Sequence, residues 1–359
     1  MLGTHLCRRL ADSGIKVLAL DVADDDTPYG DIPRNIPSGR ADITRIRGDV
    51  RDPGLVKRLM VAADAVVHCA AALPSYAPSE IWSVDLDGTR TVVNAAQAAR
   101  IGRLIHVSST AVYGVPAVIP TPESYARKPI DHYGRAKTEA EVICERARED
   151  GLEVTILRPK TFLGPQRLGL FAMLFEWADE GLNFPLPGGG NVLCQMLDVA
   201  DLVDAVFSAL TGPRDAVNGT FNIAAAEFGT LRDDFQAVLD AAGHGGRIVS
   251  IPIAPGVPVL RALSALHISP VYKRLTLKLL ADSYVDVSKA QARLGFQPRY
   301  SNRDSLLRTY EWWRHARESG PAWETGRTHR SRWRQGALRA AKAFCRASGR
   351  TESKVSCHC

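Results

Sequence analysis

Short apolar runs alternate with helix-like segments through the first 160 residues of the chain. Five runs rich in aliphatic residues predict strands: "KVLALD" (16–21), "ITRIRGD" (43–49), "AVVHCAA" (65–71), "RLIHVSS" (103–109) and "EVTILRP" (153–159). Apolar residues three or four positions apart predict amphipathic helices in "PGLVKRLMVA" (53–62), "IWSVDLDGTRTVVNAAQAAR" (81–100) and "YGRAKTEAEVICERARED" (133–150). Strands that alternate with helices pair in parallel, so the pattern predicts an α/β fold with a doubly wound, Rossmann-like sheet.

The N-terminal stretch "MLGTHLCRRLADSGIKVLALD" predicts a helix from about Gly3 to Gly14, followed by a strand that ends at Asp21. A glycine at a helix start, followed about 20 residues later by an acid at a strand end, is typical of a dinucleotide-binding βαβ unit. In such a unit, a central strand and two further glycines precede the helix. We therefore expect the unit to be incomplete here, with its first strand encoded upstream of Met1. A short chain that binds the cofactor poorly is the alternative.

Beyond about residue 165 the alternation breaks up. "FPLPGGGN" (184–191) predicts a loop, "LDVADLVDAVFSAL" (197–210) a helix capped by Asp198, and "GTFNIA" (219–224) a strand. We expect three regions: a dinucleotide-binding domain (1–165, incomplete at its N-terminus), a smaller α/β substrate-binding region (166–320) and an appended tail (321–359). The segment 258–284 is compatible with core helices or with a substrate lid.

The net charge of +6 belongs to the tail, because the residues from Arg327 onward hold nine Lys or Arg and one acid. The remaining chain is slightly acidic and gives no reason to expect a nucleic-acid surface. The sequence shows no long apolar run and no signal peptide, and its seven cysteines are scattered. We therefore expect a cytoplasmic protein.

The tail segment "SRWRQGALRAAKAFCRA" (331–347) aligns Trp333 and Phe344 on one face of a basic helix. Such a helix can make weak contact with an anionic membrane surface or a partner, and a solvated tail is the alternative. Cys357-His358-Cys359 provides too few ligands to predict a metal site, so no metal is expected.

The spacing Tyr133-x-x-x-Lys137 places a phenol and an ammonium on one face of the predicted helix 133–150. A nearby cation favours the ionised form of a phenol, which suits a general acid or base. The strand 103–109 ends at Ser109, whose hydroxyl is placed to share a substrate oxygen with Tyr133. Because the spacing also occurs by chance in many helices, this assignment depends on the segments around it.

With those segments, the chain resembles the extended short-chain dehydrogenase/reductase family, the NAD-dependent epimerases and dehydratases, over residues 1–316. Besides the Tyr-Lys pair, the similar segments are "GDVRD" (48–52), "HCAA" (68–71), "VSSTAVYG" (107–114), "RPKTFLGP" (158–165), "VDVSKAQARLGFQP" (285–298) and Trp312-Trp313. The matches occur in the order of the family.

The resemblance implies that Tyr133 transfers the substrate's hydroxyl proton, Ser109 hydrogen-bonds its oxygen and Lys137 orients the nicotinamide ribose. It assigns to the cofactor Gly3, Asp21, Asp49, Val50, Ala70, Ala71, Tyr133, Lys137, Arg158 and Pro159. It assigns to the substrate Ser109, Thr110, Lys160 and Thr161. Asp21 would accept the ribose hydroxyls and repel a 2′-phosphate, so NAD is expected rather than NADP.

Departures from the family pattern narrow the activity. Dehydratases and decarboxylases carry an acid one or two positions after the catalytic Ser or Thr, where this chain has Thr110 and Ala111. Epimerisation or oxidoreduction of a sugar hydroxyl, on a nucleotide sugar, is therefore expected. Leu193, Cys194 and Thr161 replace an arginine and an asparagine common in nucleotide-sugar enzymes. A dehydrogenase or ketoreductase of a more apolar, sterol-like alcohol stays open, as does a non-catalytic cofactor-binding regulator. Many relatives pair through the tyrosine-bearing helix, so a homodimer is expected.

Overall fold

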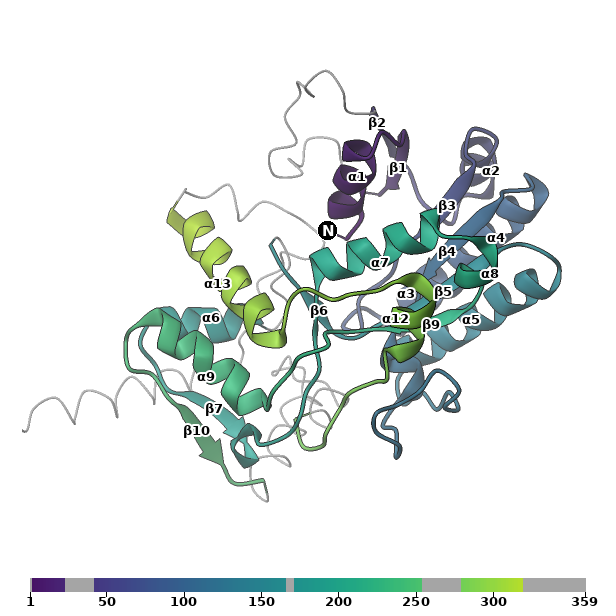
Figure 1. The fold of residues 1–359 in the computed structure, drawn as a ribbon. Helices are drawn as coiled ribbons and strands as arrows, with labels where there is room; N and C mark the ends of the chain where they lie inside the picture. Colours follow the sequence, from purple (N-terminus) through teal and green to yellow (C-terminus); the bar gives the residue numbers. More distant parts are fainter. Residues whose placement is uncertain (1, 23–41, 166–170, 254–278, 319–359) are drawn as a thin grey trace, which may run out of the picture. The chain divides into compact units, whose positions relative to one another are not determined.

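The computed structural model describes residues 2–22, 42–165, 171–253 and 279–318 (Figure 1). The chain forms two compact units. Unit 1 comprises Met1–Phe162, Met196–Ala226 and Val285–Arg299, and unit 2 comprises Leu163–Gln195, Glu227–Tyr284 and Tyr300–Cys359. The first boundary lies near the expected residue 165. Two later segments return to unit 1, because they contribute a strand and helices to its core.

Unit 1 is built on parallel strands, as the apolar runs predict. Four of them form one sheet in the order β3 (Ala65–His68), β4 (Arg103–Val107), β5 (Val154–Pro159) and β9 (Thr220–Ile223). Two more pair with each other, β1 (Val17–Asp21) and β2 (Ile43–Arg47). Two short strands, β6 (Phe162–Leu163) and β8 (Leu197–Asp198), follow later in the chain. The predicted strands and their parallel pairing are confirmed.

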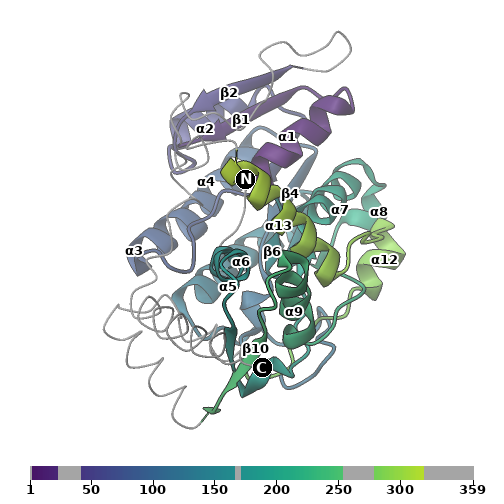
Figure 2. The ribbon, with the colours of Figure 1, turned by 90° about the vertical axis from the view of Figure 1, so that its left-hand side faces the viewer.

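Helix α1 (Leu2–Asp12) lies beside β1 and β2 (Figure 2). It ends before Gly14, whose φ of +79° is the left-handed conformation expected of a glycine after a helix. Its apolar face packs in one cluster with Val17 of β1 and Val67 of β3, although β1 and β3 belong to separate sheets in the described residues. The central strand expected in a dinucleotide-binding βαβ unit stays a prediction.

Helices α2 (Pro53–Met60), α4 (Gly88–Ala98) and α5 (His132–Glu149) pack on one face of the four-stranded sheet. Helix α3 (Pro78–Ile81) and the π-helical turn η1 (Trp82–Asp87) lead into α4 and contact α5. Val92, Val93 and Cys144 of α4 and α5 pack against Leu104 and Val154 of the sheet. The single helix predicted over 81–100 is therefore interrupted by a π-helical turn, which the apolar spacing did not predict.

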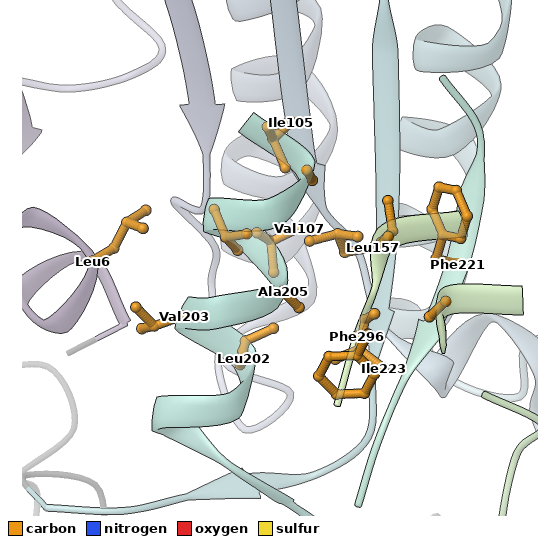
Figure 3. Close-up of a cluster of buried hydrophobic side chains, with 14 of the residues drawn as sticks. Leu6, Ile105, Val107, Leu157, Leu202, Val203, Ala205, Phe221, Ile223 and Phe296 are labelled. Carbon is orange, nitrogen blue, oxygen red and sulfur yellow. The ribbon is translucent and has the colours of Figure 1, made fainter. Parts of the chain in front are cut away.

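Helix α7 (Val199–Thr211) covers the other face (Figure 3). Asp198 caps it as predicted, since its side chain accepts a hydrogen bond of 2.8 Å from Ala200 N. Leu202 and its helical neighbours contact Ile105 and Leu157 of the sheet, and each buried aliphatic side chain contributes roughly 1.5–3 kcal/mol. Two short helices complete this unit, α8 (Arg214–Val217) and α12 (Ser288–Leu294).

Unit 2 has a mainly aromatic core. Its elements are α6 (Phe171–Asp179), β7 (Phe184–Pro187), the short turn η3 (Gly188–Gly190), α9 (Leu231–Ala242), β10 (Ile248–Ile251) and α13 (Asn302–Glu318). The loop predicted over 184–191 is wrong in its first half, because β7 pairs in parallel with β10. Phe184 N donates to Arg247 O at 2.9 Å, and strand alternation then turns the nitrogens of Pro185 and Pro187 away from β10.

Several sequence predictions concern residues outside the described ranges. The tail (321–359), including Cys357-His358-Cys359, and most of the segment 258–284 belong to this group. Within the described ranges, no helix has the length and apolar character needed to cross a membrane. The same ranges contain no cluster of three or more His, Cys, Asp or Glu residues suited to a metal ion.

Candidate active site

Helix α5 presents Tyr133 and Lys137 on one face, as the spacing predicts. Asp131 caps the helix by accepting a hydrogen bond of 2.7 Å from Gly134 N. The Lys137 Nζ lies 5.9 Å from the centroid of the Tyr133 ring. Tyr133 is half-buried, whereas Lys137 is only 2% exposed, so the phenol is the more accessible of the two groups.

Ser109 lies where β4 ends, in extended backbone that leads into the 3₁₀ turn η2 (Thr110–Tyr113). Its Oγ accepts a hydrogen bond of 3.2 Å from Ala111 N. The first turn of α5 packs against η2 so closely that a Cβ on Gly134 would lie 2.8 Å from Ala111 O. This contact joins the element that carries Ser109 to the helix that carries Tyr133.

The Lys137 ammonium is held by two oxygen atoms. It donates to Val107 O at 3.4 Å and forms an ion pair of 3.0 Å with Asp85 Oδ1. Burial alone would lower the pKa of Lys137, but Asp85 and the Tyr133 phenol raise the pKa above its ordinary value overall. The sequence analysis missed Asp85, because nothing in its local pattern distinguishes it from a surface acid of a helix.

Two buried histidines lie beside this lysine on neighbouring strands, His68 on β3 and His106 on β4, with ring centroids 5.4 Å apart. Burial, and then the charge of Lys137, lowers the pKa of His68 to about 3 and that of His106 well below its usual range. The Thr89 hydroxyl donates to Asp85 O at 2.6 Å, so it accepts from His68 Nε2 at 3.0 Å. Both imidazoles are thus neutral.

The residues assigned to the cofactor diphosphate and ribose lie at the carboxyl ends of β1 and β3. Asp21 is the last residue of β1, and the exposed Ala70 and Ala71 follow β3. A Cβ on Gly3 would lie 3.9 Å from Cys69 Sγ, which places the start of α1 over the turn after β3. Burial, with a smaller contribution from Asp21, raises the pKa of the Cys69 thiol. A glycine and two exposed alanines give a dinucleotide close access to the backbone, so these residues fit NAD.

Asp49 and Val50 have protein partners of their own. Arg51 donates to both carboxylate oxygens of Asp49, with Nε at 2.9 Å from one and 3.0 Å from the other. These hydrogen bonds lower the pKa of Asp49 below its usual range, so it is a carboxylate that can accept from an adenine amino group. Val50 packs on α4, where a Cβ on Gly88 would lie 2.9 Å from Val50 Cγ1.

The guanidinium of Arg158 belongs to a buried network that the sequence analysis missed. It donates to both carboxylate oxygens of Glu141, at 2.9 and 2.6 Å, and to the Tyr113 hydroxyl at 2.8 Å. Ser108 donates to the same Glu141 at 2.6 Å. The side chain assigned to the cofactor thus ties β5 to α5 and to the end of β4, while the neighbouring Pro159 is buried and accepts from Thr110 Oγ1 at 3.4 Å.

The residues assigned to the substrate differ in accessibility. Ser109 is half-buried, and Thr110 is buried with its hydroxyl turned to the backbone of β5. Lys160 is also buried, and its backbone N–H donates to Ile223 O at 3.0 Å. Thr161 is exposed. Ser109 and Thr161 are therefore the more accessible members of this set.

The chain is similar to known proteins over most of its length. A model of the NAD dependent epimerase/dehydratase family matches residues 1–224. The Sinorhizobium fredii protein y4nG is 38% identical over 276 residues, which are 76% of this chain and 69% of that protein. A dTDP-glucose 4,6-dehydratase of Streptomyces antibioticus is 27% identical over 297 residues, 81% of this chain and 82% of its own. The solved UDP-glucose 4-epimerase of Thermotoga maritima matches with a TM-score of 0.70 and 22% identity, covering 88% of this chain and 96% of that one.

Proposed function

Because the chain belongs to the NAD-dependent epimerase/dehydratase family of extended short-chain dehydrogenases/reductases, we propose that it acts on a sugar hydroxyl through Ser109, Tyr133 and Lys137. The observation that carries this proposal is the convergence of the three residues in unit 1. Tyr133 and Lys137 share a face of α5, and its first turn packs directly on the turn that begins at Ser109.

The residues have separate roles in the proposed reaction. Tyr133 removes or returns the proton of the substrate hydroxyl, and Ser109 hydrogen-bonds the same oxygen while its charge changes. Lys137 binds the nicotinamide ribose and keeps a positive charge near the phenol. Gly3, Asp21 and the turn after β3 would hold the rest of the cofactor. When bound, NAD supplies the acceptor or donor of the hydride.

We infer epimerisation or simple oxidation and reduction rather than loss of water. Water loss needs an acid close to the catalytic serine, and the two following positions hold Thr110 and Ala111. The Thr110 hydroxyl is buried and donates to Pro159 O, so it is turned away from a ligand at Ser109. The chemistry that remains needs a proton carrier, a hydrogen-bond donor and the nicotinamide.

A nucleotide sugar is the substrate class we propose first, since the dTDP-glucose dehydratase is similar to this chain over most of both lengths. A more apolar alcohol is the second candidate. Leu193 and Cys194 stand where nucleotide-sugar enzymes often place a diphosphate-binding arginine, and Leu193 N donates a hydrogen bond of 2.8 Å to Asp282 Oδ1. A cytoplasmic homodimer, paired through helices such as α5, completes the proposal.

The test compares the wild-type protein with Tyr133→Phe and with Tyr125→Phe as a matched control. NAD binding is measured by calorimetry, and turnover is assayed on UDP- and dTDP-sugars and on a sterol alcohol. We expect Tyr133→Phe to bind NAD but to lose turnover by about 10²–10⁴-fold, because it cannot transfer the proton. Tyr125→Phe should keep both properties.

Each other outcome has a defined meaning. Full turnover by Tyr133→Phe would show that the assigned mechanism is wrong. NAD binding without turnover on any substrate would support the non-catalytic regulator. Turnover on the sterol alcohol alone would select the second substrate class.

A further inference from the structure

We propose that Asp85 is a positioning residue of this active site, whose carboxylate fixes the Lys137 ammonium in place and balances its charge. The inference rests on the proposed function, because it concerns the lysine that would bind the nicotinamide ribose. Asp85 and Lys137 are 0% and 2% exposed, and their charged atoms lie 3.0 Å apart. A buried pair this close constrains both side chains.

The position of Asp85 depends on the π-helical turn η1 between α3 and α4. π-Helical turns within helices are uncommon and occur often at functional sites. The Asp85 backbone is held as firmly as its side chain, because its carbonyl accepts from the Thr89 hydroxyl, and His68 donates to that same hydroxyl. The carboxylate is thus presented to Lys137 by a fixed segment of backbone.

The other groups that face Lys137 do not supply this negative charge. They are Tyr133 on α5, His68 and Cys69 on or next to β3, and His106 on β4. Both histidines are neutral because their pKa values are lowered, and the raised pKa of Cys69 keeps its thiol protonated. Burial raises the pKa of Asp85 as well, but the ammonium beside it opposes that rise.

The geometry has two consequences for a bound cofactor. An ammonium has three donor hydrogens, and Val107 O accepts one of them, so donors remain for a ribose hydroxyl, while the Asp85 carboxylate lies 3.0 Å away as the counter-charge. The carboxylate also reduces the net positive charge that Tyr133 experiences. Without it, the lysine would be free to turn, and burial would lower the pKa of Lys137 because the carboxylate would no longer oppose it.

The experiment compares Asp85→Asn with Asp87→Asn, a control on the same turn whose carboxylate is 56% exposed and pairs with Arg90. NAD affinity is measured by calorimetry, and the pH profile of kcat/KM is recorded for each variant that folds. We expect Asp85→Asn to bind NAD about tenfold more weakly and to move the basic limb of the profile to lower pH, because the pKa of Lys137 falls without the carboxylate. Asp87→Asn should match the wild type in both measurements.

A second variant guards against misfolding of the first. Asp85→Glu keeps the charge but moves the carboxylate by one methylene, so it should weaken NAD binding while leaving the basic limb in place. Wild-type affinity and an unchanged pH profile in whichever of the two variants folds would overturn the proposal. Full turnover by Tyr133→Phe would instead refute the proposed function, and the role of Asp85 with it.

Discussion

The interiors of unit 1 and unit 2 differ in the kind of side chain that they bury. Unit 1 buries charged side chains in pairs, with Lys137 against Asp85 and Arg158 against Glu141. Unit 2 buries aromatic rings instead. Buried side-chain atoms without a hydrogen-bond partner among the described residues belong to Asp85, His106 and Glu153 in unit 1, and to three aromatic rings in unit 2. The atoms in unit 2 are Trp177 Nε1, Tyr310 Oη and Trp313 Nε1.

The difference shows which unit contains groups that can transfer a proton, and why burying such groups is unfavourable for stability. A buried charge is unfavourable unless it is paired, so unit 1 keeps its ammonium and carboxylates only by holding each against a partner. Unit 2 gains stability from ring packing, such as Phe175 against Tyr310 at 5.4 Å and Trp177 against Phe184 at 5.5 Å. Its core contains few groups that could transfer a proton.

Removing one charge from the buried network of unit 1 should have the largest effect on stability. Glu141→Gln leaves the Arg158 guanidinium buried without its counter-ion, which should lower the free energy of unfolding by about 3–5 kcal/mol. Glu145 lies one turn further along α5, pairs with Arg127 and is 32% exposed. Glu145→Gln removes the charge of this more exposed carboxylate. It should cost less than about 1 kcal/mol. The free energy of unfolding of both variants is measured by denaturant titration. Equal losses in the two variants would contradict the stabilising role of the buried pair.

The buried histidines should make unit 1 sensitive to acid. A histidine whose pKa is lowered by folding binds its proton more tightly in the unfolded chain, so stability falls as pH decreases below about 6.5. For His68 this loss continues toward pH 3, and each histidine contributes about 1.4 kcal/mol per pH unit while it titrates. Denaturant titrations of His106→Phe between pH 6.5 and 4.5 should show a slope smaller by that amount.

Asp234 of unit 2 should change the stability in acid in the opposite direction to the histidines. Burial raises its pKa to about 6, so this residue stabilises the fold when protonated, and its contribution is lost as pH rises through about 6. Asp234→Asn should therefore steepen the loss of stability in acid, whereas His106→Phe reduces it. Identical slopes in the two variants would show that these groups do not control the response.

Substituting one buried tyrosine in each unit should have the smallest effect on the free energy of unfolding. The Tyr113 hydroxyl in unit 1 accepts from Arg158 and donates to Asn222 Oδ1 at 2.8 Å, so Tyr113→Phe should cost about 1–3 kcal/mol. Tyr310 is 3% exposed, and its hydroxyl has no partner among the described residues of unit 2. Tyr310→Phe should therefore be neutral or slightly stabilising in the same denaturant titration. A larger loss at Tyr310 than at Tyr113 would reverse the comparison.

The predicted fold depended on local patterns, and these were reliable where burial repeats along the chain. The apolar runs that became β4 and β5 are buried, those that became β1 to β3 are mostly half-buried or exposed, and the acid before α7 caps it as its position suggested. The strand β7 was missed because two prolines are typical of a loop. Its pairing with β10, more than 60 residues later, is a tertiary contact that no local window contains.

The site was predicted less completely, for a related reason. Ser109, Tyr133 and Lys137 follow a spacing that one helix and one strand end can reveal. Asp85 acquires its role only when η1 turns it toward Lys137 in another helix. His68 and His106 each occur in an apolar run and become neighbours through the pairing of β3 and β4. Such contacts depend on register between elements, which sequence spacing does not encode.

The close approach at Gly134 limits how this enzyme can change. Any side chain there would bring a Cβ within 3.0 Å of Ala111 O and Pro129 Cβ, so α5 would have to move together with Tyr133. We therefore expect natural variants and laboratory selection to retain glycine at this position almost without exception. Libraries aimed at new substrates should instead vary exposed positions such as Thr161, where a new side chain leaves the spacing between helix and turn intact.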